Sequence, residues 1–226
     1  MMFLITMLAV PAFAQDYYIY TAEESLNINI YEKASAAVVA ITKSSKKDSQ
    51  AGTGFIISSS GHILTSKHLI DGASKVSVYL SDGTKVKGKV LKVSDEDVDL
   101  ALIKIDSGFI ETVLAISKHK ELKVGQKIYT ISNPFGFDRT FGTGIITRLE
   151  CNRKLIQMNA KINPGSSGAP VLNSRGEVIG VVQSLYNPEK SHLNIGISFA
   201  TPLSEILDLL NPFKSDIIPS GIDVRR

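Results

Sequence analysis

The chain has 226 residues, of which 43% are hydrophobic and 21% are charged, and its formal net charge at pH 7 is +3. This composition is typical of a soluble globular protein, and the length suits one large domain or two small ones. The densest basic cluster is the short segment KSSKKDSQ (Lys43–Gln50). A nucleic-acid-binding protein needs a broader basic face, so we expect no nucleic acid partner.

The N-terminal residues have the pattern of a secretory signal peptide. An apolar run, Phe3–Val10, is followed by Ala12–Ala14, which fits the small-x-small rule of a signal-peptidase site. The run is shorter than the roughly 20 residues that a membrane-spanning helix needs. We therefore expect a signal peptide over residues 1–14, cleavage near Ala14, and a periplasmic or secreted protein without an integral membrane span. The alternative is an apolar terminus with no targeting role.

Residues 15–35 are expected to form an N-terminal helical segment, with a short helix from Thr21 to about Ser35. Thr21 is a suitable N-cap, and Glu24 three residues later completes a capping-box pattern. Cys151 is the only cysteine, which excludes an internal disulfide. An exported chain without disulfides must be stabilised by a large core.

From residue 36 the chain consists of short segments rich in β-branched residues and separated by turn signals. A first set, up to about residue 110, comprises residues 37–43, 52–70, 75–93 and 99–105. A second set, from about 121 to 201, comprises residues 127–136, 140–150, 154–160, 169–173, 177–186 and 193–200. Two sets of short strands predict an all-β barrel or sandwich architecture. An amphipathic helix over residues 202–211 closes the domain, and we expect residues 212–226 to be a loosely ordered tail.

Two adjacent serines lie in a turn rich in glycine and proline, KINPGSSGAP (Lys161–Pro170). Hydrolysis by a serine requires a base for the hydroxyl, a group that orients the base, and backbone donors for the oxyanion. A bend at Gly165 can direct the N–H groups of Gly165 and Ser167 into one concavity that holds an oxyanion. The alternative is an ordinary turn with no chemical role.

His68 has the context expected of the base, and Asp99 that of the orienting acid. His68 follows the apolar stretch GHILTSK, so it should lie at the end of a buried strand. Asp99 abuts the apolar run Leu100–Ile103, so its carboxylate should be partly buried and should need a partner such as an imidazole. Each has a plain alternative, namely a structural histidine and a strand-capping aspartate. The other histidines lie in turns and loops that look exposed: His62, His119 and His192.

Five sequence blocks occur in the order found in the HtrA/Deg family of trypsin-like serine proteases, which the chain resembles from about Ala36 to Pro202. The blocks are GTGFIISSSGHILTSKHLIDGA, DVDLALIKI, ISNPFG, INPGSSGAPVLNSRGEVIGV and IGISFATP. The resemblance implies a chymotrypsin-like fold of two antiparallel β-barrels with short terminal helices and an active site between the barrels. It also implies an endopeptidase that acts on proteins or peptides, serves in protein quality control, and needs no metal or organic cofactor.

Carried over residue by residue, the resemblance implies that His68 is the general base, Asp99 the orienting acid and Ser167 the nucleophile. Gly165 and Ser167 would supply the oxyanion hole. Ser166 stands where zymogen-type relatives have an aspartate that pairs with a newly freed N-terminus. A serine cannot form that ion pair, so we expect no activation of this kind.

Substrate contacts follow from the same resemblance. Lys161 lies where trypsin-like folds line the primary specificity pocket, so it either favours acidic substrate side chains or extends from the pocket rim into solvent. A substrate strand is expected to pair with Ile195–Pro202. The other expected contacts are Ile162, Gly196, Ile197 and Ser198.

Many relatives form trimers through N-terminal segments, and Asp16–Tyr20 (DYYIY) is the candidate contact for such a homo-oligomer. Many also carry a PDZ domain after the protease domain, for which the chain leaves no room, so we expect the protease domain alone. One alternative function is a non-catalytic module that grips extended peptides on the same fold. Another is a glutamyl-type or toxin-like protease, which differs in specificity only. All three triad members are present, which favours an enzyme.

Overall fold

The computed structural model describes residues 19–43, 51–70, 72–95, 97–106, 108, 110, 112–119, 121–136, 138–150, 154–185 and 196–217. Several expectations fall on residues outside these ranges. They concern the signal peptide, the first part of the proposed subunit contact (Asp16–Tyr18), Cys151 and His192.

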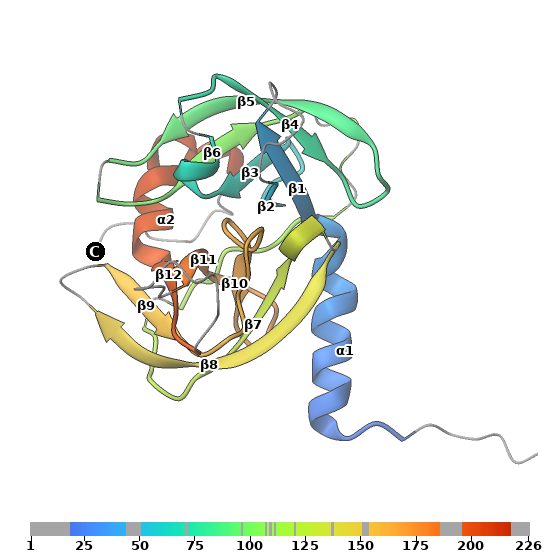
Figure 1. Cartoon of the computed structure of the whole chain (residues 1–226), viewed down its shortest axis with the longest axis vertical. Coiled ribbons are helices and arrows are strands. Elements are labelled where there is room, and N and C mark those ends of the chain that lie inside the picture. Colours follow the sequence, from blue (N-terminus) through green and yellow to red (C-terminus); the bar gives the residue numbers. More distant parts are fainter. Residues whose placement is uncertain are drawn as a thin grey trace, which may run out of the picture.

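Helix α1 (Ala22–Ala34) precedes the barrels and begins where the sequence predicts. The Glu24 N–H donates to Thr21 Oγ1 (3.2 Å), and the Thr21 N–H donates to Glu24 Oε2 (2.7 Å), so the predicted capping box is confirmed. The helix projects beyond the barrels at its N-terminal end (Figure 1). Its last turn is buried through Ile30 and Ala34, and a 3₁₀ turn (Ser35–Ala37) leads into the first strand.

Two antiparallel β-barrels make up most of the described chain, as the sequence predicts, with barrel one above barrel two in Figure 1. The strands of barrel one are β1 (Val38–Lys43), β2 (Gly52–Ile56), β3 (His62–Thr65), β4 (Lys75–Tyr79), β5 (Lys85–Val93) and β6 (Ala101–Lys104). They close in the order β1-β2-β3-β6-β5-β4.

The strands of barrel two are β7 (Lys127–Ser132), β8 (Thr140–Glu150), β9 (Leu155–Met158), β10 (Pro170–Leu172), β11 (Val178–Leu185) and β12 (Ser198–Pro202). They close in the order β10-β11-β12-β9-β8-β7. In a closed barrel each strand is paired on both sides. A free strand edge therefore occurs only where one strand extends past the end of its neighbour.

Helix α2 (Leu203–Leu210) follows β12 and holds the two barrels together. Its buried apolar side chains belong to one hydrophobic cluster that also contains Leu100 of barrel one and Val181 of barrel two. The helix lies beside both barrels in Figure 1. Barrel two has a second, smaller core around Ile128 and Met158. The shared cluster makes the junction between the barrels part of a continuous core.

The chain continues beyond α2 as a 3₁₀ turn (Asn211–Phe213) and a helical turn, α3 (Lys214–Ile217). The expectation of a loose tail is therefore wrong for residues 212–217. The reason is that Phe213 packs against the shared core and Ile217 is only 8% exposed. No helix in the described ranges is long and apolar enough to cross a membrane.

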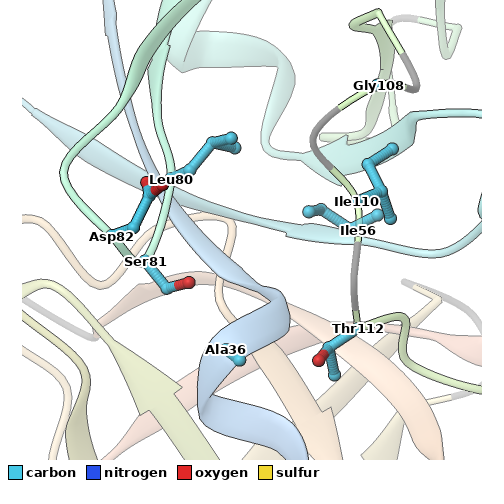
Figure 2. Close-up of a pocket in the computed structure, with 8 residues that line it drawn as sticks. All are labelled: Ala36, Ile56, Leu80, Ser81, Asp82, Gly108, Ile110 and Thr112. Atoms are coloured by element: carbon cyan, nitrogen blue, oxygen red, sulfur yellow. The ribbon is translucent and has the colours of Figure 1, made fainter.

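A pocket of about 280 Å³ opens on barrel one beside the end of α1 (Figure 2). Ile56, Leu80 and Ile110 give it an apolar lining, and Asp82 is its one charged lining residue. The Asp82 carboxylate accepts hydrogen bonds from the N–H and the hydroxyl of Thr84, both at 2.8 Å. Because that charge is engaged by its own turn, the pocket offers no free ionic group to a ligand.

Candidate active site

His68 lies just after β3, in the 3₁₀ turn Lys67–Leu69, so its predicted position at the end of a buried strand is confirmed. The turn is anchored on both sides. The buried Ser66 hydroxyl donates to Val182 O of β11 (3.1 Å), and Lys67 Nζ donates to Asp95 O (2.8 Å). The imidazole itself is 50% exposed, so solvent and ligands can reach it.

Asp99 comes two residues before β6, which pairs antiparallel with β3 in a register that places Ala101 opposite Thr65. That register brings Asp99 alongside the His68 turn. Asp99 Oδ2 lies 2.7 Å from His68 Nδ1, and Asp99 Oδ1 accepts the His68 backbone N–H at 2.9 Å. The aspartate side chain is only 14% exposed. Both carboxylate oxygens therefore orient the histidine, one through its ring and one through its backbone.

The pKa of Asp99 lies below its ordinary value. Burial by itself raises the pKa of this carboxyl, but the hydrogen bonds from the His68 ring and backbone N–H, the charge of His68 and the Ser66 hydroxyl together outweigh burial. The carboxylate is thus ionised at neutral pH and only accepts hydrogen bonds. Nδ1 of His68 must then carry a proton, which leaves Nε2 as the basic nitrogen.

This lowered pKa predicts a stability contribution that disappears in acid. Because the folded pKa is lower than the unfolded value of about 3.9, the pairing stabilises the fold above that value and is lost as the pH falls through the folded pKa. We expect the difference in unfolding free energy between wild type and Asp99→Asn to shrink below about pH 4. Urea unfolding followed by circular dichroism measures this difference in unfolding free energy. If the difference is the same at about pH 5 and at about pH 3, the prediction is contradicted.

Ser167 lies in the loop between β9 and β10, which we call the nucleophile turn (residues 163–169) after the role that the resemblance implies for Ser167. Its hydroxyl donates to Gln183 O of β11 at 3.2 Å, and it is not hydrogen-bonded to His68 in this structure. The neighbouring carbonyl, Val182 O, accepts from both the Ser66 hydroxyl and the Gly168 N–H (2.8 Å). The His68 turn and the nucleophile turn are therefore docked on successive carbonyls of one strand.

The N–H groups of Gly165 and Ser167 have no acceptor within the described part of the chain, whereas those of Ser166 and Gly168 do. Gly165 is buried and Ser167 is half-buried, and N–H groups in such positions are rarely unpaired, so these two donors are candidates for binding a substrate oxygen. Hydrogen bonds on the preceding carbonyls fix their direction. The Phe135 N–H donates to Pro164 O (2.9 Å), and the Ala169 N–H donates to Ser166 O (3.0 Å). In a trans peptide the N–H points opposite to its C=O, so both donors face away from these contacts.

Thr53 of β2 attaches the nucleophile turn to barrel one. Its N–H donates to Ser167 O (2.9 Å), and its hydroxyl donates to Gly165 O (2.7 Å) while accepting from the Asn133 N–H (3.0 Å). Thr53 is fully buried, and its carbonyl accepts from the Thr65 hydroxyl (2.6 Å). Neither Thr53 nor Asn133 was expected as a site residue. Both lie in sequence blocks that characterise the family, but a contact across 112 residues has no local signal.

We expect Thr53→Val to impair catalysis more than substrate binding. Valine keeps the shape but leaves the Asn133 N–H and Gly165 O buried without partners, at about 1–3 kcal/mol for each group. The nucleophile turn should then loosen, lowering kcat at least about ten-fold with a smaller change in KM, and Thr53→Ser should restore kcat. Steady-state kinetics on folded variants measures this, and an equal fall for valine and serine counts against a role of the hydroxyl.

The residues expected to contact substrate are not all placed as predicted. Ser198 is fully buried, and its hydroxyl donates to Ala160 O (3.0 Å). Residues 198–200 pair with β11 on one side and β9 on the other. The expectation that a substrate strand pairs there is therefore wrong, because the closed barrel leaves no edge. Gly196 is exposed and Ile197 is half-buried just before the strand.

A free edge lies instead at the end of β11, beside Ser167. Gln183–Leu185 extends past the residues that pair with β10, and within the described ranges only β12 pairs with this part of the strand. Its position next to Ser167 makes it the better candidate for pairing with a substrate. Sequence analysis missed it because the free edge depends on where β10 ends, which is set by the fold.

Lys161 and Ile162 point to opposite sides of an extended segment. Ile162 is 3% exposed and belongs to the core of barrel two, whereas Lys161 is exposed. Lys161 lines a pocket formed with β7, β8 and Ser166, and the walls of this pocket include neither Ser167 nor Gly196–Ser198. The structure thus separates Lys161 from the other residues expected to contact substrate.

His62 was expected to lie in an exposed turn, but it is the first residue of β3 and is only 3% exposed. Its Nδ1 lies 2.8 Å from Ser58 Oγ and 3.0 Å from Ser60 Oγ, so the hydroxyls of the preceding turn allow the ring to be buried. His119 is exposed, as expected. The described residues contain no group of three or more histidine, cysteine or acidic side chains arranged to hold a metal ion.

Comparisons with known proteins identify the family. A family model described as a trypsin-like peptidase domain matches residues 52–181. A probable periplasmic serine endoprotease, DegP-like, from Pseudomonas fluorescens is 39% identical over 170 residues, covering 73% of this chain and 35% of the relative. The protein of the same name from Hahella chejuensis is 38% identical over 169 residues, covering 72% of this chain and 35% of that relative. The chain thus spans about a third of the length of these curated relatives.

Solved structures give the same result. The serine endoprotease from Yersinia pestis has a TM-score of 0.73 and 29% identity, covering 84% of this chain and 67% of that chain. An HtrA-type protease, AlgW, solved with a tripeptide has a TM-score of 0.73 and 30% identity, covering 83% of this chain and 63% of that chain. The chain therefore belongs to the trypsin-like peptidase domain family, as a protease domain of the HtrA/Deg type.

Proposed function

We propose that the protein is an exported serine endopeptidase in which His68, Asp99 and Ser167 form the catalytic triad. The observation that carries the proposal is the docking of the oriented His68–Asp99 pair and the Ser167 turn on adjacent carbonyls of β11. The two unpaired N–H groups of the same turn support it, because acyl transfer needs donors beside the nucleophile.

In the proposed reaction, Ser167 Oγ attacks the scissile carbonyl carbon while His68 Nε2 takes the hydroxyl proton. The N–H groups of Gly165 and Ser167 hold the resulting oxyanion, and Asp99 stabilises the imidazolium. The imidazolium then protonates the leaving amine, and the acyl-enzyme remains. Water attacks the ester as His68 takes its proton, which releases the acid and restores Ser167.

The hydrogen bond from the Ser167 hydroxyl to Gln183 O connects substrate binding to the activation of Ser167 in these reaction steps. A substrate strand that pairs with Gln183–Leu185 places a backbone N–H on Gln183 O. That N–H competes with the serine hydroxyl for the same acceptor, so the hydroxyl is released to turn toward His68 Nε2. The nucleophile is then engaged by its base when an extended peptide lies along β11.

Labelling with a fluorophosphonate probe tests the proposed function. Wild type should be labelled at Ser167, and Ser167→Ala and His68→Ala should not be labelled. Ser174→Ala, which changes an exposed serine in the turn before β11, serves as the control and should be labelled like wild type. Wild-type protein that is folded but unlabelled would instead support a non-catalytic peptide-binding module.

The proposal extends to location and assembly. The DegP-like relatives are named as periplasmic, which supports a periplasmic or secreted protein that acts on other proteins, in keeping with quality control. Ile19 and Tyr20, just before α1, are 88% and 49% exposed, and these adjacent exposed apolar side chains support the N-terminal segment as the contact of a homo-oligomer. Light scattering on the full chain and on Ile19→Asp tests the assembly, because only the first should form a trimer.

A further inference from the structure

A second pocket, of about 420 Å³, lies against the nucleophile turn and is lined by residues of barrel two alone. Ser166 lines it, whereas Ser167 does not, so it is separate from the surface on which the nucleophile meets its base. Its volume falls within the range of pockets that bind small molecules. It is large enough for about one amino-acid residue.

The segment that leads into the nucleophile turn gives this pocket a polar wall. In an extended chain, alternate side chains face opposite sides. Ala160 and Ile162 are buried in the core of barrel two, and the residues between and beside them line the pocket: Asn159, Lys161 and Asn163. One strand-like segment thus directs three polar side chains to the same side.

Most of these polar groups can donate a hydrogen bond and have no partner among the described residues. The Lys161 ammonium group and the Asn163 side-chain amide have no hydrogen bond or ion pair within the described part of the chain. Asn159 Oδ1 accepts the Ile145 N–H (2.8 Å), which leaves the amide nitrogen of Asn159 as a donor. The Thr130 and Thr143 hydroxyls on the facing strands are also without partners among these residues.

The charge of the pocket is positive. Lys161 is the single charged lining residue, and no aspartate or glutamate lines the walls. Pro134 and Phe141 supply apolar surface. Donors around one ammonium group suit an anion with several acceptor lone pairs, such as a carboxylate or a phosphate, and the apolar surface beside them favours a carboxylate attached to an apolar group.

We propose that this pocket binds a carboxylate-bearing ligand of about one residue, preferentially the free C-terminal end of a peptide, and that binding adjusts the nucleophile turn. The effect on Ser167 rests on the proposed function, whereas the binding itself does not. The C-terminal end is favoured because a terminal residue offers Lys161 a carboxylate and offers Phe141 and Pro134 a side chain.

Ser166 connects the pocket to the catalytic machinery. Its hydroxyl lies 3.1 Å from Ser132 Oγ and accepts the Asn163 N–H at 3.3 Å. It stands between Gly165 and Ser167, whose N–H groups are the proposed oxyanion donors. A ligand that hydrogen-bonds to Asn163 or Ser166 therefore acts on the peptide units that carry those donors.

Calorimetric titration of the Ser167→Ala chain tests the binding without requiring catalysis. The probes are N-acetylphenylalanine, with a terminal carboxylate; N-acetylglutamic acid α-amide, with a side-chain carboxylate; and N-acetylphenylalanine amide, with neither. We expect the first to bind most tightly and the third at least ten-fold more weakly. A tighter second probe would assign the pocket to acidic side chains. Equal binding of N-acetylphenylalanine and its amide would overturn the proposal.

Variants and amide NMR shifts locate the site. Lys161→Met, which keeps the aliphatic stem, should weaken binding of N-acetylphenylalanine at least ten-fold, and Lys161→Arg should stay within about three-fold of the parent. The bound probe should shift the amide signals of Gly142 and Thr143. Shifts confined to Gln183–Leu185 would place the probe in the substrate cleft as a product analogue, and would overturn the assignment.

The coupling is tested separately on a chain with an intact Ser167. N-acetylphenylalanine should change the rate of fluorophosphonate labelling at least two-fold in wild type and leave it unaltered in Lys161→Met. Binding without any change in the rate would overturn the coupling. If wild type were not labelled at all, the proposed function would fail while the titration result stood, so the two failures are distinguishable.

Discussion

Replacing Asp99 with asparagine is expected to lower kcat about 10⁴-fold while the protein remains folded. Asp99 accepts two hydrogen bonds, from His68 Nδ1 (2.7 Å) and from the His68 backbone N–H (2.9 Å). An asparagine has one acceptor oxygen and one donor amide at these positions. With its oxygen on the backbone N–H, its amide faces Nδ1 and requires that nitrogen to be unprotonated. The proton then moves to Nε2, which can no longer act as the base.

The matched control for this change is Asp95→Asn, which removes an exposed carboxylate from the same loop. It should leave kcat within about two-fold of wild type, since electrostatic effects between exposed groups are screened by salt. Steady-state kinetics with a peptide substrate, at a temperature well below the unfolding of either variant, measures both. Similar losses for the two variants would show that the loop charge matters and the histidine tautomer does not.

Replacing Gly168 with alanine is expected to destabilise the fold by at least about 3 kcal/mol and to abolish labelling of Ser167. Gly168 has a φ of +83°, and a Cβ at this position would lie 2.1 Å from Thr53 O and 2.4 Å from Thr65 Oγ1. Both neighbours are buried and hydrogen-bonded, so neither can move without breaking the link between the barrels. The nucleophile turn would have to shift away from β2 and from the His68 turn.

Gly176→Ala is the control for backbone strain. Gly176 has a similar φ of +75°, but nothing lies within 4 Å of the position where its Cβ would be. This substitution should lower the free energy of unfolding by only about 1–2 kcal/mol, which is the cost of an alanine in the left-handed conformation. Urea unfolding of the two variants separates strain from collision. Equal destabilisation would mean that β2 does not closely confine the nucleophile turn.

The parts of the fold that depend on local patterns were predictable from the sequence. The bounds expected for β8, 140–150, match the structure, and the capping box of α1 starts that helix at the expected residue. In both cases the evidence lay within a few residues of the feature. The pairing of His68 with Asp99 was expected from the family resemblance, and the structure brings the two together because β3 pairs with β6.

The features that were missed depend on where distant segments meet. The role of Thr53 arises because β2 abuts a turn more than a hundred residues later, and the free edge at Gln183 exists only because β10 is short. His62 seemed exposed because its turn is polar, yet the serines of that turn are the groups that satisfy the buried ring. Polar residues indicate exposure only when they do not bond to one another.

The link through Thr53 also determines when in folding the chain can become reactive. His68 and Asp99 are supplied by barrel one, whereas Ser167 and its backbone donors belong to barrel two and are tied to β2 across 112 residues. Long-range contacts of this kind form late, since the chain must first lose the entropy of closing a large loop. In a chain that is still emerging or only half folded, the proposed base is present without an ordered nucleophile. With the proposed triad, proteolytic competence coincides with completion of the fold, which protects the folding chains from one another.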